Sequence, residues 1–136
     1  MKKSIKLIAI LALLAIGFTA CHKDNGNDYV GTPHKARYEI VSLGEGESII
    51  KLTYYTQNTV GINHEPEVIS ETTITPWQAE FTFDGAWPLE LFAYSEFDDN
   101  YERFPIKASL YIDDILVAEQ QSDEYYSIFL DYYYDE

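Results

Sequence analysis

The chain has little cysteine and few basic residues. Cys21 is the only cysteine among 136 residues, so no disulfide can form within the chain. Nine Lys and Arg residues stand against 23 Asp and Glu, which gives a formal net charge of -14 at pH 7. A surface this acidic repels phosphate backbones, so the composition argues against nucleic acid as a partner.

No apolar run at the N-terminus is long enough to span a membrane. Leu7–Phe18 is an uncharged run of twelve residues, whereas a transmembrane helix needs about 17–25. A basic segment, Lys2–Lys6, precedes this run, and the small residues Thr19–Ala20 follow it. The pattern is typical of a signal peptide, which we expect over residues 1–20.

The segment Phe18-Thr19-Ala20-Cys21 resembles the lipobox of bacterial lipoproteins. This resemblance implies that Cys21 carries a thioether-linked diacylglycerol and an N-terminal acyl chain such as palmitate. Three acyl chains anchor a protein stably, because each buried CH₂ contributes about 0.8 kcal/mol. We therefore expect a lipoprotein held in the outer membrane through Cys21.

Residues 21–35 lack apolar periodicity, and we expect them to form a flexible tether behind the lipidated cysteine. Lys23 and the acidic residues that follow resemble the surface-export signal of Bacteroidetes lipoproteins. That resemblance implies exposure at the cell surface. The alternative is an outer-membrane lipoprotein that faces the periplasm.

The remaining chain has the period-two alternation of β-strands. In Gln78–Phe83 the residues Ala79, Phe81 and Phe83 share one face, which predicts a strand with one wet side. Similar segments separated by turn signals predict eight strands: 36–42, 48–55, 67–75, 78–83, 89–95, 105–112, 115–119 and 125–133. This spacing indicates one all-β domain over 36–136, an antiparallel sandwich or barrel.

Two local features carry more detailed predictions. Asp113-Asp114 is a candidate two-residue hairpin turn, although the usual glycine is missing. Pro76 fixes the entry into the strand that contains Phe81 and Phe83, so we expect Trp77 to be buried in the core.

The order of several segments is similar to that of the MmpS-like family of small membrane-associated proteins. The segments are the strand pair 38–55, Thr75–Phe81 with its Pro-Trp, and the hairpin Lys107–Ala118. The resemblance implies an immunoglobulin-like β-sandwich of about seven to eight strands. It also implies an accessory role beside a large envelope transporter. The chain departs from the family at Asp114, where glycine is common, and in having a lipobox in place of a transmembrane helix.

The strongest candidate site in the sequence is an acidic loop that also holds aromatic residues. Its candidate binding residues are Glu96, Asp98, Asp99, Tyr101 and Glu102. The loop could offer oxygen ligands to Ca²⁺ or present aromatic rings to a sugar or protein. The favoured interpretation is a solvated connection whose charge keeps the protein soluble. It has no glycine to fold around an ion, so we expect at most weak Ca²⁺ binding, at about 10⁻⁴–10⁻³ M.

The sequence contains no recognisable catalytic pattern. His64 with Glu65 and Glu67 could supply part of a zinc site, but a loop histidine beside surface acids is the favoured interpretation. No G-x-S-x-G motif and no glycine-rich phosphate loop occurs. We therefore expect that the chain is not an enzyme and that it has no cofactor and no dedicated metal site.

These features together predict a non-catalytic, lipid-anchored binding or interaction module of the cell envelope, with an envelope protein or a glycan as partner. Two alternatives remain open from the sequence. One is an accessory subunit of an envelope transporter, and the other is a surface lipoprotein that binds a metal or glycan weakly.

The lipid anchor makes a direct prediction. Cys21→Ala removes the thiol that accepts the diacylglycerol, so the variant should leave the detergent-soluble membrane fraction and appear with the soluble proteins. Cell fractionation followed by immunoblotting measures this. A variant that still fractionates with the membrane would show that the lipobox interpretation is wrong.

Overall fold

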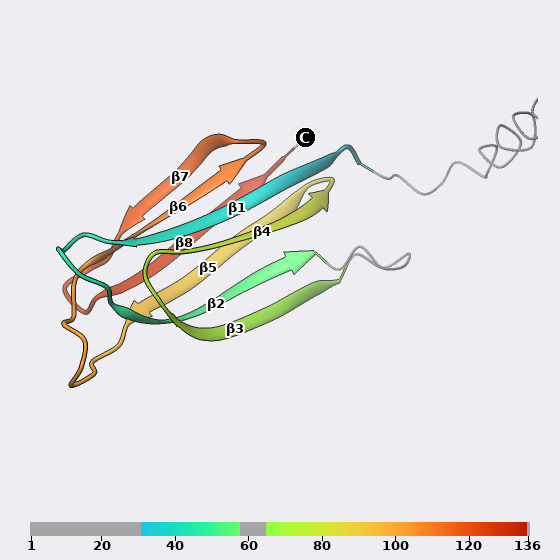
Figure 1. Cartoon of the computed structure of the whole chain (residues 1–136). Coiled ribbons are helices and arrows are strands. Elements are labelled where there is room, and N and C mark those ends of the chain that lie inside the picture. Colours follow the sequence, from blue (N-terminus) through green and yellow to red (C-terminus); the bar gives the residue numbers. More distant parts are fainter. Residues whose placement is uncertain (1–30, 58–64, 136) are drawn as a thin grey trace, which may run out of the picture.

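The computed structural model describes residues 31–57 and 65–135, which form strands and the turns between them (Figure 1). The strands are β1 (Pro33–Ser42), β2 (Ile49–Gln57), β3 (Pro66–Ile74), β4 (Trp77–Asp84), β5 (Trp87–Ser95), β6 (Ile106–Ile112), β7 (Ile115–Gln121) and β8 (Ser127–Tyr134). Within these residues, no helix has the length and apolar character needed to cross a membrane. The expected signal peptide and Cys21 lie outside the described residues.

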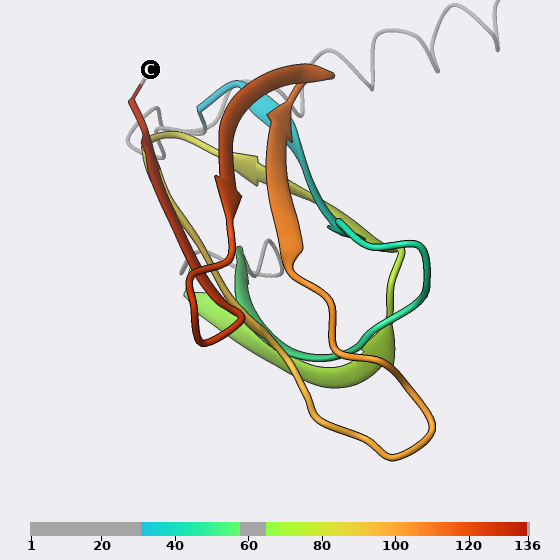
Figure 2. The same ribbon diagram turned by 90° about the vertical axis from the view of Figure 1, so that its left-hand side faces the viewer.

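The strands form two four-stranded antiparallel sheets. The first sheet has the order β4-β1-β6-β7 and the second the order β3-β2-β5-β8. Only β2–β3 and β6–β7 pair as hairpins along the described chain, while the other connections cross between sheets. Figure 2 shows the two layers facing each other. The structure is therefore a sandwich and not a barrel, and all eight predicted strands are confirmed.

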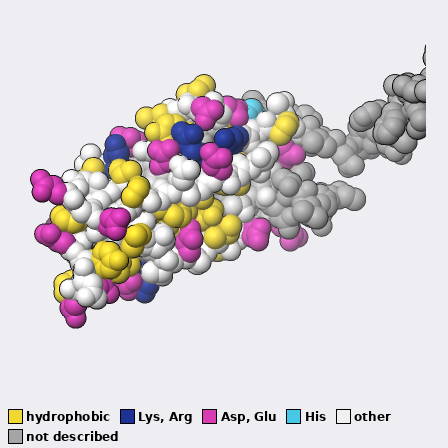
Figure 3. Space-filling view, in the orientation of Figure 1, with side chains coloured by type: hydrophobic (Ala, Val, Ile, Leu, Met, Phe, Trp, Pro, Cys, Tyr) yellow, Lys and Arg dark blue, Asp and Glu magenta, His cyan; other side chains and the backbone are white. Residues whose placement is uncertain are grey.

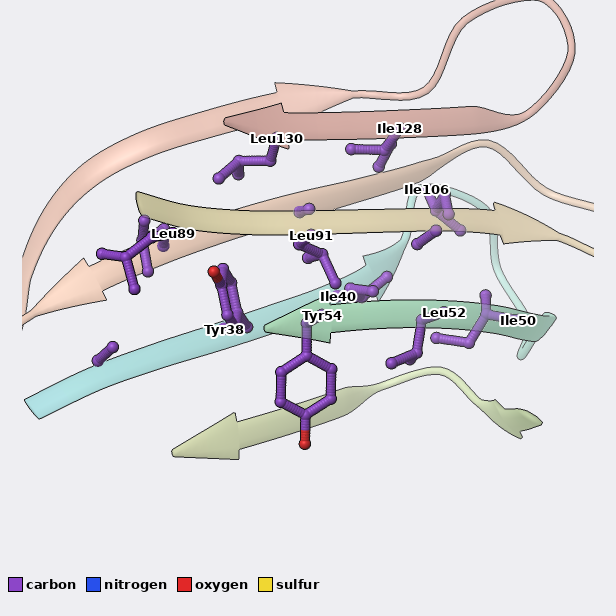
Figure 4. Packing of buried hydrophobic residues seen from close by; sticks show 14 of the residues in the cluster. Tyr38, Ile40, Ile50, Leu52, Tyr54, Leu89, Leu91, Ile106, Ile128 and Leu130 are labelled. Atoms are coloured by element: carbon purple, nitrogen blue, oxygen red, sulfur yellow. The ribbon is translucent and has the colours of Figure 1, made fainter. Parts of the chain in front are cut away.

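The core lies between the two sheets and is built from alternate residues of the strands. Figure 4 shows these side chains pointing into the space between the layers. Fully burying one large aliphatic side chain contributes about 1.5–3 kcal/mol. Buried side chains include Tyr38, Ile40, Ile50, Leu52, Leu89, Leu91, Ile106, Leu110, Ile128 and Leu130.

The Asp113-Asp114 turn joins β6 to β7, as expected. The φ angles of Asp113 and Asp114 are 50° and 67°, the left-handed values that a type I′ turn needs at both central residues. Asp tolerates this region because its short side chain can hydrogen-bond locally. Here the Asp113 carboxylate accepts a hydrogen bond from the Lys35 amide at 2.9 Å, which stabilises the turn without glycine.

The structure differs from the sequence-based expectation at two places. Trp77 is only partly buried. It begins β4, which is an edge strand, so no neighbouring strand covers one side of its ring. Its indole N–H donates to Glu71 at 2.6 Å, and Trp87 on β5 is the tryptophan in the core. In addition, β1 begins at Pro33, earlier than expected, because Pro33 and the residues after it pair with β4.

The two tryptophans should differ in their effect on stability. Trp87 is only 9% exposed, so Trp87→Ala should lower the free energy of unfolding by about 3–5 kcal/mol, as expected for a truncated core aromatic. Trp77→Ala should cost clearly less, about 1–2 kcal/mol. Urea denaturation followed by tyrosine fluorescence measures both. Equal losses would contradict the edge position of Trp77.

Candidate binding surface

The two outer faces of the sandwich differ in chemistry. The outer face of the first sheet carries four ion pairs. Lys35–Glu80 at 3.1 Å and Lys107–Glu119 at 3.5 Å join neighbouring strands. Arg37 pairs with Glu39 of its own strand at 3.0 Å and with Asp114 of the β6–β7 turn at 3.1 Å. Figure 3 shows basic side chains flanked by acidic ones on this side. The charges of this face are therefore engaged with one another.

The outer face of the second sheet presents aromatic rings instead. Phe92 of β5 and Phe129 of β8 are directly paired and are 44% and 54% exposed. Tyr133 of β8 lies farther along the same face and is also exposed. Large exposed rings that lie side by side on one face are typical of recognition surfaces, since most exposed apolar residues occur singly.

The second sheet also carries two acidic residues directly opposite each other. Glu90 of β5 pairs in register with Asp131 of β8. Neither carboxylate forms an ion pair with another of the described residues. Like charges in this position are destabilising. Because neither carboxylate has a cationic partner in this part of the chain, both can accept hydrogen bonds from a ligand.

A hollow of about 380 Å³ lies on this face, over β2 and beside the rings of β5. Phe92 and Tyr94 form one wall, with ring centroids 6.0 Å apart. Thr53 occupies the position between Phe92 and Ser70 across the three strands, and the hydroxyls of Thr53 and Ser70 lie 2.9 Å apart. The hollow forms because the short side chains of Thr53 and Ser70 lie beside the larger ring of Phe92. Its volume falls within the range of about 300–1,000 Å³ typical of ligand sites.

Lys51 closes one end of this hollow. Its ammonium pairs with the Glu96 carboxylate at 2.7 Å, and this hydrogen bond raises the pKa of Lys51. Glu71 also lines the hollow, and one of its oxygens accepts the Trp77 indole N–H. Hydroxyls, rings and neutralised charge therefore line the space.

The candidate residues of the acidic loop do not converge on one point, as the ligands of a metal site would. Glu96 turns toward Lys51, and Asp98 accepts hydrogen bonds from the amide of Asn100 at 2.8 Å and, through its carbonyl, from that of Tyr101 at 3.2 Å. The nearby cation, Arg103, donates to backbone carbonyls. Among the described residues, no group of three or more potential metal-ligating side chains comes together.

Asp99 and Glu102 are also exposed, and Glu102 and Tyr101 line a shallow hollow beside the turn between β1 and β2. The ring of Phe104 fills the space next to Gly44, where a Cβ atom would overlap it. This contact holds the loop against the neighbouring turn. Calcium binding by these residues stays a prediction, and His64 lies outside the described residues.

A separate cluster of polar side chains joins three strand ends. His34 of β1 contacts Asp113 at 2.6 Å through Nδ1 and the Tyr134 hydroxyl at 3.0 Å through Nε2. The hydrogen bond from the Lys35 amide, followed by that with His34, lowers the pKa of Asp113. The cluster connects β1 to the β6–β7 turn and to β8. Sequence reasoning placed His34 in the tether and did not anticipate this.

The aromatic face was also missed, although the alternation contained a signal. Leu89, Leu91 and Ala93 point inward, so the same period places Phe92 and Tyr94 outward. The alternation could not show which residue of the adjacent strand lies beside each ring. That depends on pairing between strands far apart along the chain.

The sequence matches no protein-family model and no curated protein. The resemblance to the MmpS-like family therefore remains a prediction, and the function is argued from the surface itself.

The low pKa of Asp113 predicts a contribution to acid sensitivity. A carboxyl whose pKa is lowered by folding stabilises the protein above its unfolded pKa of about 3.9, and this contribution is lost as the pH falls through the folded value. Asp113→Asn should lower stability at pH 7 by roughly 0.5–1 kcal/mol, because the group is half exposed. As the pH falls from about 5 to about 2, the variant should also lose less stability than the wild type, because it lacks the carboxyl that becomes protonated.

Urea denaturation over this pH range measures both effects. Asp114→Asn is the matched control, since it keeps the turn and removes only an exposed ion pair with Arg37. An equal pH response in the two variants would show that Asp113 does not have the assigned role.

Proposed function

We propose that this chain is a non-catalytic binding module of the cell envelope, anchored by lipid on Cys21, whose binding surface is the outer face of β3-β2-β5-β8. The observation that carries the proposal is the contrast between the two faces. One engages its charges internally, while the other exposes paired rings around a hollow.

The chemistry of the hollow favours binding over catalysis. Nucleophilic catalysis needs a nucleophile held by a base. The hydroxyl of Thr53 contacts only that of Ser70 among the described hydrogen bonds, and no histidine or cysteine lines the hollow. Lys51 and Glu71 are already engaged by Glu96 and Trp77. The hydroxyls and aromatic rings that line the rest of the hollow suit orientation of a ligand.

The alternative roles have less support. A role as accessory subunit of a transporter rests on the family resemblance alone. Metal binding by the acidic loop is disfavoured by the engagement of Glu96 with Lys51 and of Asp98 within its own turn. The aromatic face therefore remains the best-supported site.

Photo-cross-linking in intact cells tests the surface. Phe92→p-benzoylphenylalanine extends one exposed ring into a photoreactive benzophenone, so it should give adducts larger than the chain upon illumination. The same substitution at Tyr111, on the first sheet, and at Phe97, in the acidic loop, provides matched controls. Adducts at Phe97 but not at Phe92 would move the binding site to the loop. Equal yields at all three positions would contradict a defined surface.

A further inference from the structure

We propose that the hollow on the second sheet binds an uncharged oligosaccharide. This inference rests on the proposed function and adds the ligand class. It follows from the aromatic rings and hydroxyls that line this space, and from the carboxylates of Glu90 and Asp131, unpaired among the described residues, elsewhere on the same face.

The aromatic wall suits the apolar face of a sugar ring. Phe92 and Tyr94 alternate outward on β5, and their rings lie at an interplanar angle of 51°. The face of an aromatic ring is electronegative, so it attracts the positively polarised C–H groups of a pyranose. Phe129, paired with Phe92 on β8, extends the aromatic surface beyond the hollow. A chain of several sugars could therefore contact more than one ring.

The opposite side of the hollow suits sugar hydroxyls. Ser70 and Thr72 alternate along β3, and Thr53 lies between Ser70 and Phe92. Each hydroxyl both donates and accepts hydrogen bonds, as sugar hydroxyls do. Thr53 and Ser70 satisfy only part of this capacity by bonding each other, so a flat apolar partner would leave the remaining donor and acceptor sites unsatisfied. The mixed lining thus favours a glycan over the apolar surface of a protein.

The distribution of charge selects an uncharged ligand. Every Lys and Arg in residues 31–57 and 65–135 already has an acidic or carbonyl partner, so an anionic sugar would have to displace that partner to be neutralised. Glu90 and Asp131, on the same face, would repel uronic acids and sulfate groups. Their oxygens can instead accept hydrogen bonds from neutral hydroxyls.

Isothermal titration calorimetry with the full chain in detergent tests the proposal. The probes are five neutral hexasaccharides, namely cellohexaose, laminarihexaose, xylohexaose, mannohexaose and maltohexaose, with hexagalacturonate as the anionic comparison. At least one neutral probe should bind, and hexagalacturonate should not. Phe92→Ala should weaken binding about tenfold, since it removes the central ring contact.

Phe97→Ala is the matched control, because it removes a more exposed phenyl ring that does not line the hollow. Ser70→Ala should weaken binding by a smaller factor, about threefold. Circular dichroism and urea denaturation establish that each variant is folded. Equal weakening by Phe92→Ala and Phe97→Ala would overturn the assigned site.

Two further outcomes separate this inference from the proposed function. If no neutral probe binds at millimolar concentration while Phe92 cross-links in cells, the glycan inference fails and the binding surface stands with a protein partner. If hexagalacturonate binds as tightly as the neutral probes, the selection for uncharged sugars is wrong.

Discussion

The register of β5 between β2 and β8 is the constraint on which both the core and the outer surface depend. This register places Leu89, Leu91 and Ala93 between the sheets and Phe92 with Tyr94 on the outside. Because side chains alternate strictly along a strand, a slip of one residue would exchange the two sets. The burial of the leucines therefore fixes the aromatic wall of the hollow, although those rings add little to the core.

Much of the fold was predictable because its signals are local. Alternation located all eight strands, and Asp113-Asp114 located a hairpin even without glycine. Trp77 was assigned to the core wrongly, since apolarity and a preceding proline do not distinguish an edge strand from a central one. The candidate site was harder to predict from the sequence, because Phe92 and Phe129 become neighbours only through pairing of segments far apart in the chain.

Charge is distributed more selectively than the net value of -14 indicates. The few basic side chains serve to bridge neighbouring strands of the first sheet or to fasten loops, as Arg103 does through the carbonyls of Ser95 and Tyr125. The excess acid is left at the surface, where it favours solubility and repulsion between copies. Composition alone could report this excess but not which face carries it.

The central position of β1 has a mechanical consequence. Its residues Pro33–Ile40 pair with β4 and Ala36–Ser42 pair with β6, both antiparallel. If the chain is anchored through Cys21, any pull along the tether enters the fold at the start of β1. Detaching this strand lengthwise would require both ladders of hydrogen bonds to shear together, whereas an edge strand would open one bond at a time. With such an anchor, the domain would be pulled through a strand suited to carrying load.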